Sequence, residues 1–423
     1  MKAPELLAPA GTLRNLRYAI AYGADAVYAG MPRYSLRVRN NDFSTIENLA
    51  TGIEHVHASG KSFFMATNLL PHNSKVRTFM ADMEPIIELG PDALIMADPG
   101  LIMMVRERWP ELAIHLSVQA NTMNYASVRF WQQLGIRRII LSRELSLDQV
   151  EEIRQACPDT ELEVFVHGAL CIAYSGRCLL SGYFNHRDAN QGSCTNACRW
   201  DYKVKDREED IGGDVRPVKV HLLEEASRPG ELMPVEEDEH GTYIMNSKDL
   251  RAVQHVERLV KIGIDSLKIE GRTKSHYYTA RTAQVYRKAI DDAVAGRPFD
   301  PGLLGTLENL ASRGYTDGFF QRHHDHETQN YIDNHSKSTQ QRFVGELIAY
   351  NPATGMVEVE VKNKFSVGDE LELIMPGGNR SFQLEKMHDM NGQPTDVAPG
   401  SGHRVQIPMQ DGECELGLLA CNL

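Results

Sequence analysis

The first 300 or so residues repeat one pattern, which restricts the possible folds more than any other feature of the chain. A short apolar strand is followed by an amphipathic helix, a glycine and the next strand. Three helix-to-strand junctions are alike: GADAVYAG at 23–30, GPDALIMADPG at 90–100 and GIDSLKIEG at 263–271. Strands that alternate with helices pair in parallel, because each helix carries the chain back to the edge where the previous strand began.

The pattern predicts eight strands, at Glu5–Pro9, Asp25–Gly30, Lys61–Asn68, Asp92–Ala97, Ala113–Gln119, Arg137–Ser142, Glu161–His167 and Asp265–Glu270. Eight strand–helix units predict an α/β fold, a closed (β/α)8 barrel of the TIM type. An open, doubly wound parallel sheet is the alternative.

Local signals support the helices of this fold. Ser44 with Glu47, and Ser146 with Gln149, match the capping box that begins a helix. The last barrel helix is predicted to bury one stripe of residues, formed by Tyr278, Thr282, Val285, Ala289 and Ala293.

The pattern changes near the C-terminus, which predicts a second domain. We expect the barrel to occupy 1–320, with a short helix at 301–313, and a linker to occupy 321–341. His323, His324 and His326 in the linker are more typical of a polar surface segment than of a metal site. In 342–423, alternating stretches such as MVEVEVKNKF and turn signals such as PGGN predict a small all-β barrel. This domain either holds RNA away from the chemistry or serves as a structural cover or an oligomerisation surface.

Composition narrows the functional classes. The start of the chain lacks a signal-peptide pattern, and no apolar stretch has the length of a membrane span, so we expect a cytoplasmic protein without a membrane partner. An odd number of cysteines, seven, also favours a reducing compartment. The net charge of −12 disfavours indiscriminate binding of nucleic acid, so an RNA substrate would require a local basic patch. The sequence does not indicate an oligomeric state.

Four cysteines fall close together, at Cys171, Cys178, Cys194 and Cys198, with the spacing C-x6-C-x15-C-x3-C. Four thiolates suit an iron–sulfur cluster or zinc. The absence of a C-x2-C knuckle favours the cluster, whose irons lie apart, while zinc, two disulfides and reduced core cysteines remain alternatives. The segment begins just past the seventh strand, and active sites of (β/α)8 barrels lie where strands end.

The cysteines open an insertion at about 171–246, before a helix predicted at Asp249–Gly263. Its part at 203–241 is rich in acidic residues, proline and glycine, and we expect it to form a hairpin that covers the mouth of the barrel, the face at the carboxyl ends of the strands.

Polar residues follow several strands at the same mouth. Arg143 and Glu144 follow the sixth strand, and the eighth strand carries Lys268 and Glu270 and leads to Arg272. These five are the candidate catalytic residues. Weaker candidates are Arg33, Arg37, Arg39, Asn68, Asp98, Gln119, Asn121 and Lys274. Any one of them alone is more often a cap or a solvated loop residue, but the gathering of cations suits a small carboxylate or an RNA phosphate.

The run E-x-F-x-x-G-A-L-C-x4-G-x-C-x-L-S at Glu163–Ser181 resembles the signature of the collagenase-like peptidases, peptidase family U32. PELLAPAG, GSCTNACRW, NSKDL and SLKIEGR extend the resemblance over essentially the whole chain.

The resemblance implies an activity. One branch of the family converts the wobble uridine of certain tRNAs to 5-hydroxyuridine, using prephenate and no molecular oxygen. Sister branches hydroxylate an rRNA cytidine or the ubiquinone ring. Members hold a [4Fe–4S] cluster on four cysteines, whose matching positions here are Cys171, Cys178, Cys194 and Cys198. The implied partners are the anticodon region of tRNA and prephenate, a small dicarboxylate of the kind that arginine binds in bidentate fashion.

Two other functions stay open. Proteolysis is the first, although the chain has neither an H-E-x-x-H helix nor a G-x-S-x-G elbow. His167 is near Cys171 in sequence, as a cysteine protease would require, but that cysteine is better explained as a ligand. A non-enzymatic module that binds RNA or carries a cluster is the second.

Overall fold

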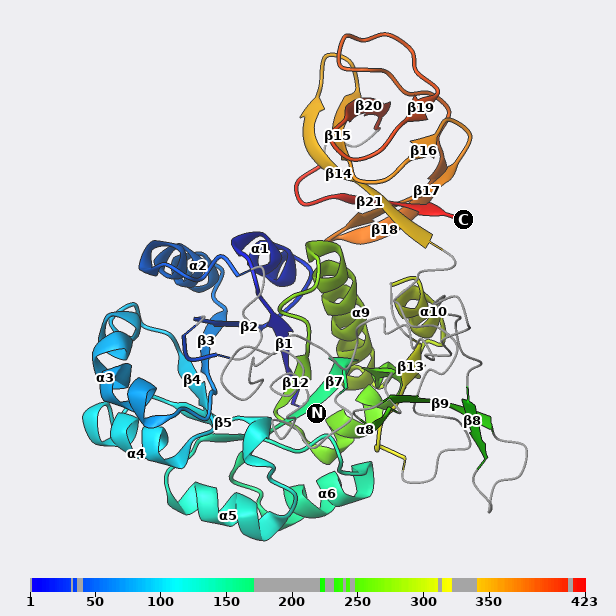
Figure 1. Ribbon diagram of the computed structural model, residues 1–423. Coiled ribbons are helices and arrows are strands. Elements are labelled where there is room, and N and C mark those ends of the chain that lie inside the picture. The colour runs from blue at the N-terminus through cyan, green and yellow to red at the C-terminus, as the bar shows by residue number, and fades with distance from the viewer. Residues whose placement is uncertain are drawn as a thin grey trace, which may run out of the picture.

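The computed structural model describes residues 2–31, 33–35, 41–170, 248–310, 314–321, 341–409 and 414–423, and the backbone of 221–224, 232–238 and 241–243. Eight parallel strands form its centre (Figure 1): β1 (Glu5–Pro9), β2 (Ala26–Gly30), β3 (Ser62–Thr67), β4 (Ala93–Met96), β5 (Ile114–Leu116), β6 (Arg138–Ile140), β7 (Glu161–Ala169) and β12 (Ser266–Ile269). Each pairs with the next, and β12 pairs with both β7 and β1, which closes the sheet. The closed barrel is confirmed and the open sheet is excluded.

Helices surround the barrel: α1 (Leu13–Ala21), α2 (Ile46–Ala58), α3 (Asn73–Ile87), α4 (Pro99–Arg108), α5 (Tyr125–Gln133), α6 (Leu147–Ala156), α8 (Val256–Ile262) and α9 (His276–Val294), followed by α10 (Gly302–Glu308). The capping box of Ser146 and Gln149 is confirmed, and so is the buried stripe of α9. The capping box at Ser44 is wrong. Thr45 caps α2 instead, because its hydroxyl accepts from the backbone N–H of Asn48.

The segment after the insertion differs from the prediction of a helix that begins at Asp249. Residues Asp249–Arg251 form a strand, β11, which pairs antiparallel with the end of β7 and parallel with β13 (Tyr315–Thr316). A 3-10 turn, η4 (Val253–His255), then leads into α8. The reason is the length of β7, whose last backbone groups extend beyond the barrel and take β11 as their partner.

The described part of the insertion is a three-stranded antiparallel sheet. Its strands are β8 (His221–Glu224), β9 (Leu232–Asp238) and β10 (Gly241–Tyr243), in the order β10-β9-β8. The pairing of β8 with β9 agrees with the predicted hairpin. That the hairpin covers the mouth stays a prediction, and the four clustered cysteines lie outside the described residues.

The C-terminal part is antiparallel, as its alternating sequence predicts. Its strands are β14 (Gln341–Asn351), β15 (Met356–Val361), β16 (Phe365–Ser366), β17 (Glu370–Met375), β18 (Gly378–Gln383), β19 (Val397–Ala398), β20 (Arg404–Pro408) and β21 (Leu418–Asn422). Six of them form one sheet in the order β18-β17-β21-β14-β15-β20, and β16 pairs with β19. An apolar core of their own lies beneath them.

This C-terminal sheet packs against the outside of α1 and α9 (Figure 1). Arg281 of α9 binds the carboxylate of Glu372 with both terminal nitrogens, at 2.9 and 2.8 Å. The buried carboxylate of Glu346 contacts Arg14 of α1 and lies 3.2 Å from the hydroxyl of Tyr18. Ile374, Leu418 and Ala420 also join the apolar core of the barrel. Among the described residues, no helix is both long and apolar enough to cross a membrane.

Candidate active site

A network of buried charges fills the barrel below its mouth. Side chains of a strand alternate between the two faces, so one set from each strand points into the barrel. Arg138 lies 2.5 Å from Glu5 and 3.5 Å from Glu163, measured between guanidinium nitrogen and carboxylate oxygen. The ammonium of Lys268 lies 2.9 Å from the other oxygen of Glu163. Lys268, expected at the mouth, is therefore an interior residue, 3% exposed, whose counter-ion is Glu163.

Tyr28 joins three of the five candidate residues. Its ring centroid lies 4.4 Å from the Lys268 ammonium and 5.6 Å from the Arg272 guanidinium carbon. Its hydroxyl donates to a carboxylate oxygen of Glu270 at 3.1 Å. Arg272 in turn donates to the hydroxyl of Ser35 at 2.6 Å. The structure thus brings Lys268, Glu270 and Arg272 around the ring of Tyr28, a residue that the sequence pattern places only within a buried strand.

The other two candidates lie by β6 and β7. Arg143 donates to the backbone oxygen of Ala169 at 2.8 Å, and its guanidinium carbon lies 5.1 Å from the ring centroid of Phe165. The same ring lies 5.4 Å from the ammonium of Lys268. Glu144 contacts the hydroxyl of Ser142. Phe165 of β7 therefore lies between Arg143, which follows β6, and Lys268 of β12 in the Tyr28 group.

Several weaker candidates have ordinary roles. Asp98 caps α4, because its carboxylate accepts from the backbone N–H of Leu101 at 2.9 Å. Arg33 pairs with Asp82 at 3.1 Å on the surface. Arg37 and Arg39 lie outside the described residues.

Gly30 makes room for the Arg272 side chain. A Cβ atom at position 30 would lie 2.3 Å from a guanidinium nitrogen of Arg272 and 2.2 Å from the Ser35 hydroxyl. We expect Gly30→Ala to lower the free energy of unfolding by about 1–3 kcal/mol, the usual cost of overpacking. Urea denaturation measures it. Gly305→Ala is the matched control, since nothing lies within 4 Å of a Cβ there; an equal effect of the two changes would contradict the crowding at Gly30.

The cysteine segment begins at this mouth. Gly168 has φ +102°, and a Cβ atom there would lie 2.2 Å from the backbone oxygen of Glu270, so glycine lets the end of β7 approach the end of β12. Cys171 follows three residues later. Four thiolates are a donor set that fits an iron–sulfur cluster. Among the described residues, no group of three or more His, Cys, Asp or Glu side chains could hold a metal ion.

His167, near the end of β7, lies in an aromatic cage. Its ring centroid is 5.7 Å from that of Tyr278 and 5.5 Å from those of Tyr286 and Tyr315. Burial lowers the pKa of His167 to about 3, and Lys274 and Arg251 act in the same direction against the carboxylate of Asp249. The folded protein therefore keeps this imidazole neutral.

The neutral His167 predicts acid sensitivity. Between pH 6.5 and about 3 the unfolded chain binds a proton at this imidazole and the folded chain does not, so stability falls as the pH falls. We expect His167 to account for a loss of about 2 kcal/mol between pH 7 and pH 5. Urea denaturation at the two pH values should show a smaller loss for His167→Gln than for the wild type or for the surface variant His403→Gln. The same loss in all three would refute the assignment.

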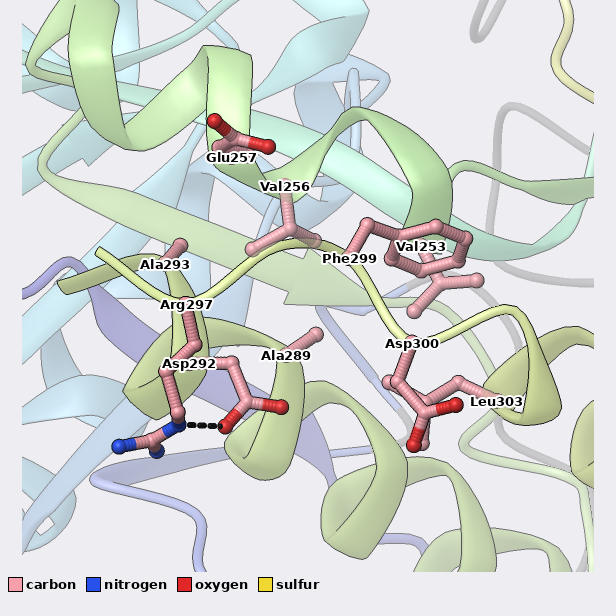
Figure 2. Close-up of a pocket in the computed structure, with 10 residues that line it drawn as sticks. All are labelled: Val253, Val256, Glu257, Ala289, Asp292, Ala293, Arg297, Phe299, Asp300 and Leu303. Carbon is pink, nitrogen blue, oxygen red and sulfur yellow. Dashed lines mark hydrogen bonds and ion pairs between the residues drawn. The ribbon is translucent and has the colours of Figure 1, made fainter. Parts of the chain in front are cut away.

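A small hollow lies elsewhere, between α8, α9 and α10 (Figure 2). Val256, Ala289 and Leu303 line it, and at its edge Arg297 binds Asp292 at 2.6 Å. Helices of such barrels run antiparallel to the strands, so the end of α9 at this hollow is remote from the mouth. Its charged groups are already paired, and we assign it no chemistry.

Comparison with known proteins identifies the family. The model of "Peptidase family U32" matches residues 11–330, and that of its C-terminal domain matches residues 339–420. The chain belongs to peptidase family U32. Similar proteins include "tRNA hydroxylation protein P" of Escherichia coli, 60% identical over 100% of this chain and 97% of the relative, and the protein of the same name from Haemophilus influenzae, 57% identical over 99% and 96%. A more distant relative, 27% identical over 96% and 95%, is a "Collagenase" of Porphyromonas gingivalis.

Proposed function

We propose that this protein hydroxylates tRNA, converting the wobble uridine to 5-hydroxyuridine with prephenate as cosubstrate, and that Cys171, Cys178, Cys194 and Cys198 hold a [4Fe–4S] cluster. The observation that carries the proposal is the meeting of two features at one mouth. Cations from β6 and β12 gather there, and the four-cysteine segment starts there. Full-length similarity to proteins named for tRNA hydroxylation supports the choice of substrate.

The residues at the mouth have separate tasks in this reaction. Arg272, fixed by Ser35 and Tyr28, and Arg143, fixed by the backbone of Ala169, are placed to bind carboxylates or phosphate. Glu270, beside them, is placed to accept a proton. A pyrimidine must leave its stack to reach such a mouth. Replacing its C5 hydrogen by a hydroxyl group requires an oxygen donor and an acceptor for two electrons, and a cluster on the four cysteines would carry these electrons from the base to that acceptor.

Peptidase activity is the alternative that the collagenase relative favours. A cysteine peptidase requires an imidazole that takes the proton of its thiol. His167 is enclosed by three tyrosine rings, and its low pKa makes it a poor base. We therefore rank proteolysis below hydroxylation.

The contacts of the C-terminal sheet favour a structural role for it over a grip on tRNA. The sheet shares apolar residues with the barrel core, and its buried Glu346 serves Arg14 and Tyr18 of α1. These residues already contact the barrel, so they do not form a surface for RNA.

The proposal predicts the effect of Arg143→Ala and Arg272→Ala. Each removes a charge-assisted contact, so we expect about a tenfold to hundredfold loss of 5-hydroxyuridine formation. Mass spectrometry of tRNA from a deletion strain that carries each variant measures it, with the iron content of the purified protein measured in parallel. Arg108→Ala, which removes a surface partner of Glu84, is the matched control. Wild-type levels of hydroxylation in both test variants would contradict the proposal. A deletion strain that carries the wild-type protein and forms no 5-hydroxyuridine would also contradict it.

A further inference from the structure

An oriented amide lies at the end of β5. The side-chain nitrogen of Asn68 donates to the hydroxyl of Ser117 at 3.3 Å, and that hydroxyl donates to Oε1 of Gln119 at 3.3 Å. The backbone N–H of Gln119 also donates to the Ser117 hydroxyl. The Ser117 hydroxyl oxygen thus accepts two hydrogen bonds, and the hydroxyl donates its proton to the Gln119 side-chain oxygen. The Gln119 amide is therefore oriented with its oxygen toward Ser117 and its NH2 group away from it.

The NH2 group of Gln119 has no hydrogen-bond partner in the part of the chain that the structure describes, although the residue is only 5% exposed. Leaving a buried donor unpaired costs about 1–3 kcal/mol. A bound ligand that accepts this hydrogen bond would explain why the donor is left unpaired.

The backbone around Gln119 is held in an unusual conformation. Asn121 has φ 51° and ψ 53°, a left-handed conformation that is uncommon for any residue other than glycine. Its side-chain nitrogen donates to the backbone oxygen of Gln119 at 2.9 Å, and its backbone N–H donates to Val118 at 2.9 Å. These two hydrogen bonds hold the backbone on either side of Gln119 in place.

Gln119 follows a strand that lies across the barrel from Arg272. Strand order in the closed sheet places β5 opposite β1, whose neighbours are β12, which leads to Glu270 and Arg272, and β2, which contains Tyr28. Arg272 and Glu270 therefore follow a strand on the far side of the mouth from β5, Arg143 follows the neighbouring strand β6, and Gln119 offers a neutral donor after β5. This arrangement suits a ligand with an anionic part and, opposite it, a carbonyl oxygen.

We propose that the Gln119 NH2 group donates to O4 of the extruded uracil and so selects uridine against cytidine. The inference rests on the proposed function. Uracil has a carbonyl oxygen at position 4 where cytosine has an amino group, which is itself a donor. Because Oε1 of Gln119 already accepts from Ser117, the amide cannot turn to accept from that amino group without breaking the chain from Asn68. A site built to pair one polar group rejects an analogue that leaves it unpaired.

Two variants of the full-length, iron-loaded protein test this role. Gln119→Glu has the same shape but replaces the donor by an acceptor, and Gln119→Met removes the donor without adding charge. Gln133→Glu, on the exposed side of α5, is the matched control. The first measurement is binding of anticodon stem-loops with uridine or cytidine at the wobble position, followed by fluorescence anisotropy. We expect the wild type and the control to prefer uridine, and both Gln119 variants to lose at least about tenfold of that preference.

The second measurement is kcat/KM for tRNA hydroxylation, with iron content, Tm and the half-saturating concentration of prephenate as internal checks. We expect kcat/KM to fall at least about tenfold in both Gln119 variants while the three checks stay at wild-type values. An unchanged uridine preference overturns the inference, and so does a rise in half-saturating prephenate alone, which would assign the amide to the small acid. A wild-type protein that binds both stem-loops equally and hydroxylates neither instead overturns the proposed function.

Discussion

Alanine at any one of Cys171, Cys178, Cys194 and Cys198 is expected to abolish the iron–sulfur absorbance of anaerobically prepared protein, and tRNA hydroxylation with it. The wild type should be brown, with a broad band near 400 nm and roughly four irons per chain. A cubane takes one thiolate at each iron, so no ligand is dispensable without loss of affinity. Absorbance spectra and iron and sulfide analysis of each variant measure the effect.

The remaining cysteines provide controls within the same chain. Cys157 and Cys421 are buried in the barrel and in the C-terminal sheet, and Cys414 is partly buried beside the latter. Alanine at each of the three should leave the iron content unchanged. Stoichiometric zinc without iron in the anaerobic wild type would instead identify the segment as a structural zinc site.

Glu163→Ala is expected to lower the free energy of unfolding by about 3–5 kcal/mol, because it leaves the buried Lys268 ammonium without its counter-ion. Glu163 is 0% exposed and contacts Lys268 at 2.9 Å and Arg138 at 3.5 Å. Arg138 keeps Glu5 and Glu161, so the uncompensated charge is that of Lys268. Urea denaturation followed by circular dichroism measures the change.

The double variant Glu163→Leu with Lys268→Met separates lost pairing from lost packing. Removing both charges should restore most of the lost stability, since a buried ion pair is often worth no more than apolar residues of similar size. Glu257→Ala breaks the exposed pair with Lys261 and should cost about 0.5 kcal/mol or less. Two results would contradict this account of the interior ion pair. One is a loss of unfolding free energy in Glu163→Ala as small as that in Glu257→Ala, and the other is a double variant no more stable than Glu163→Ala.

The order of elements in the barrel could be predicted from the sequence because the same local pattern of strand, amphipathic helix and glycine repeats along the chain. All eight strands lie at their predicted positions, but the fifth ends already at Leu116 and a 3-10 helix, Val118–Ala120, takes the place of its predicted end. Local rules failed where two neighbouring residues were chemically equivalent. Ser44 and Thr45 can both cap a helix, and it is the Thr45 hydroxyl that accepts from the backbone N–H of Asn48. They failed again at Asp249, since its strand exists only through long-range pairing with Ala169 of β7.

The mouth was predicted in part. Arg143, Glu270 and Arg272 were predicted at the mouth because each follows the end of a strand. The same rule placed Lys268 at the mouth, whereas it lies in the barrel interior. Alternation could have corrected this, because Lys268 stands two residues before Glu270 on the same inward face. Tyr28 could have been found in the same way, as the inward residue two before Gly30. The orientation of Gln119 could not, because it depends on Asn68 and Ser117 from different strands.

The barrel can close only late in the synthesis of the chain. Ser266 of β12, which pairs with Glu5 of β1, stands 261 residues further along the chain. At about 5–20 residues per second, β1 waits roughly 13–50 s for this partner. Cys198, the last of the four clustered cysteines, is made before Ser266. The thiols therefore leave the ribosome several seconds before the barrel can close, and metal delivery during translation would meet an open sheet.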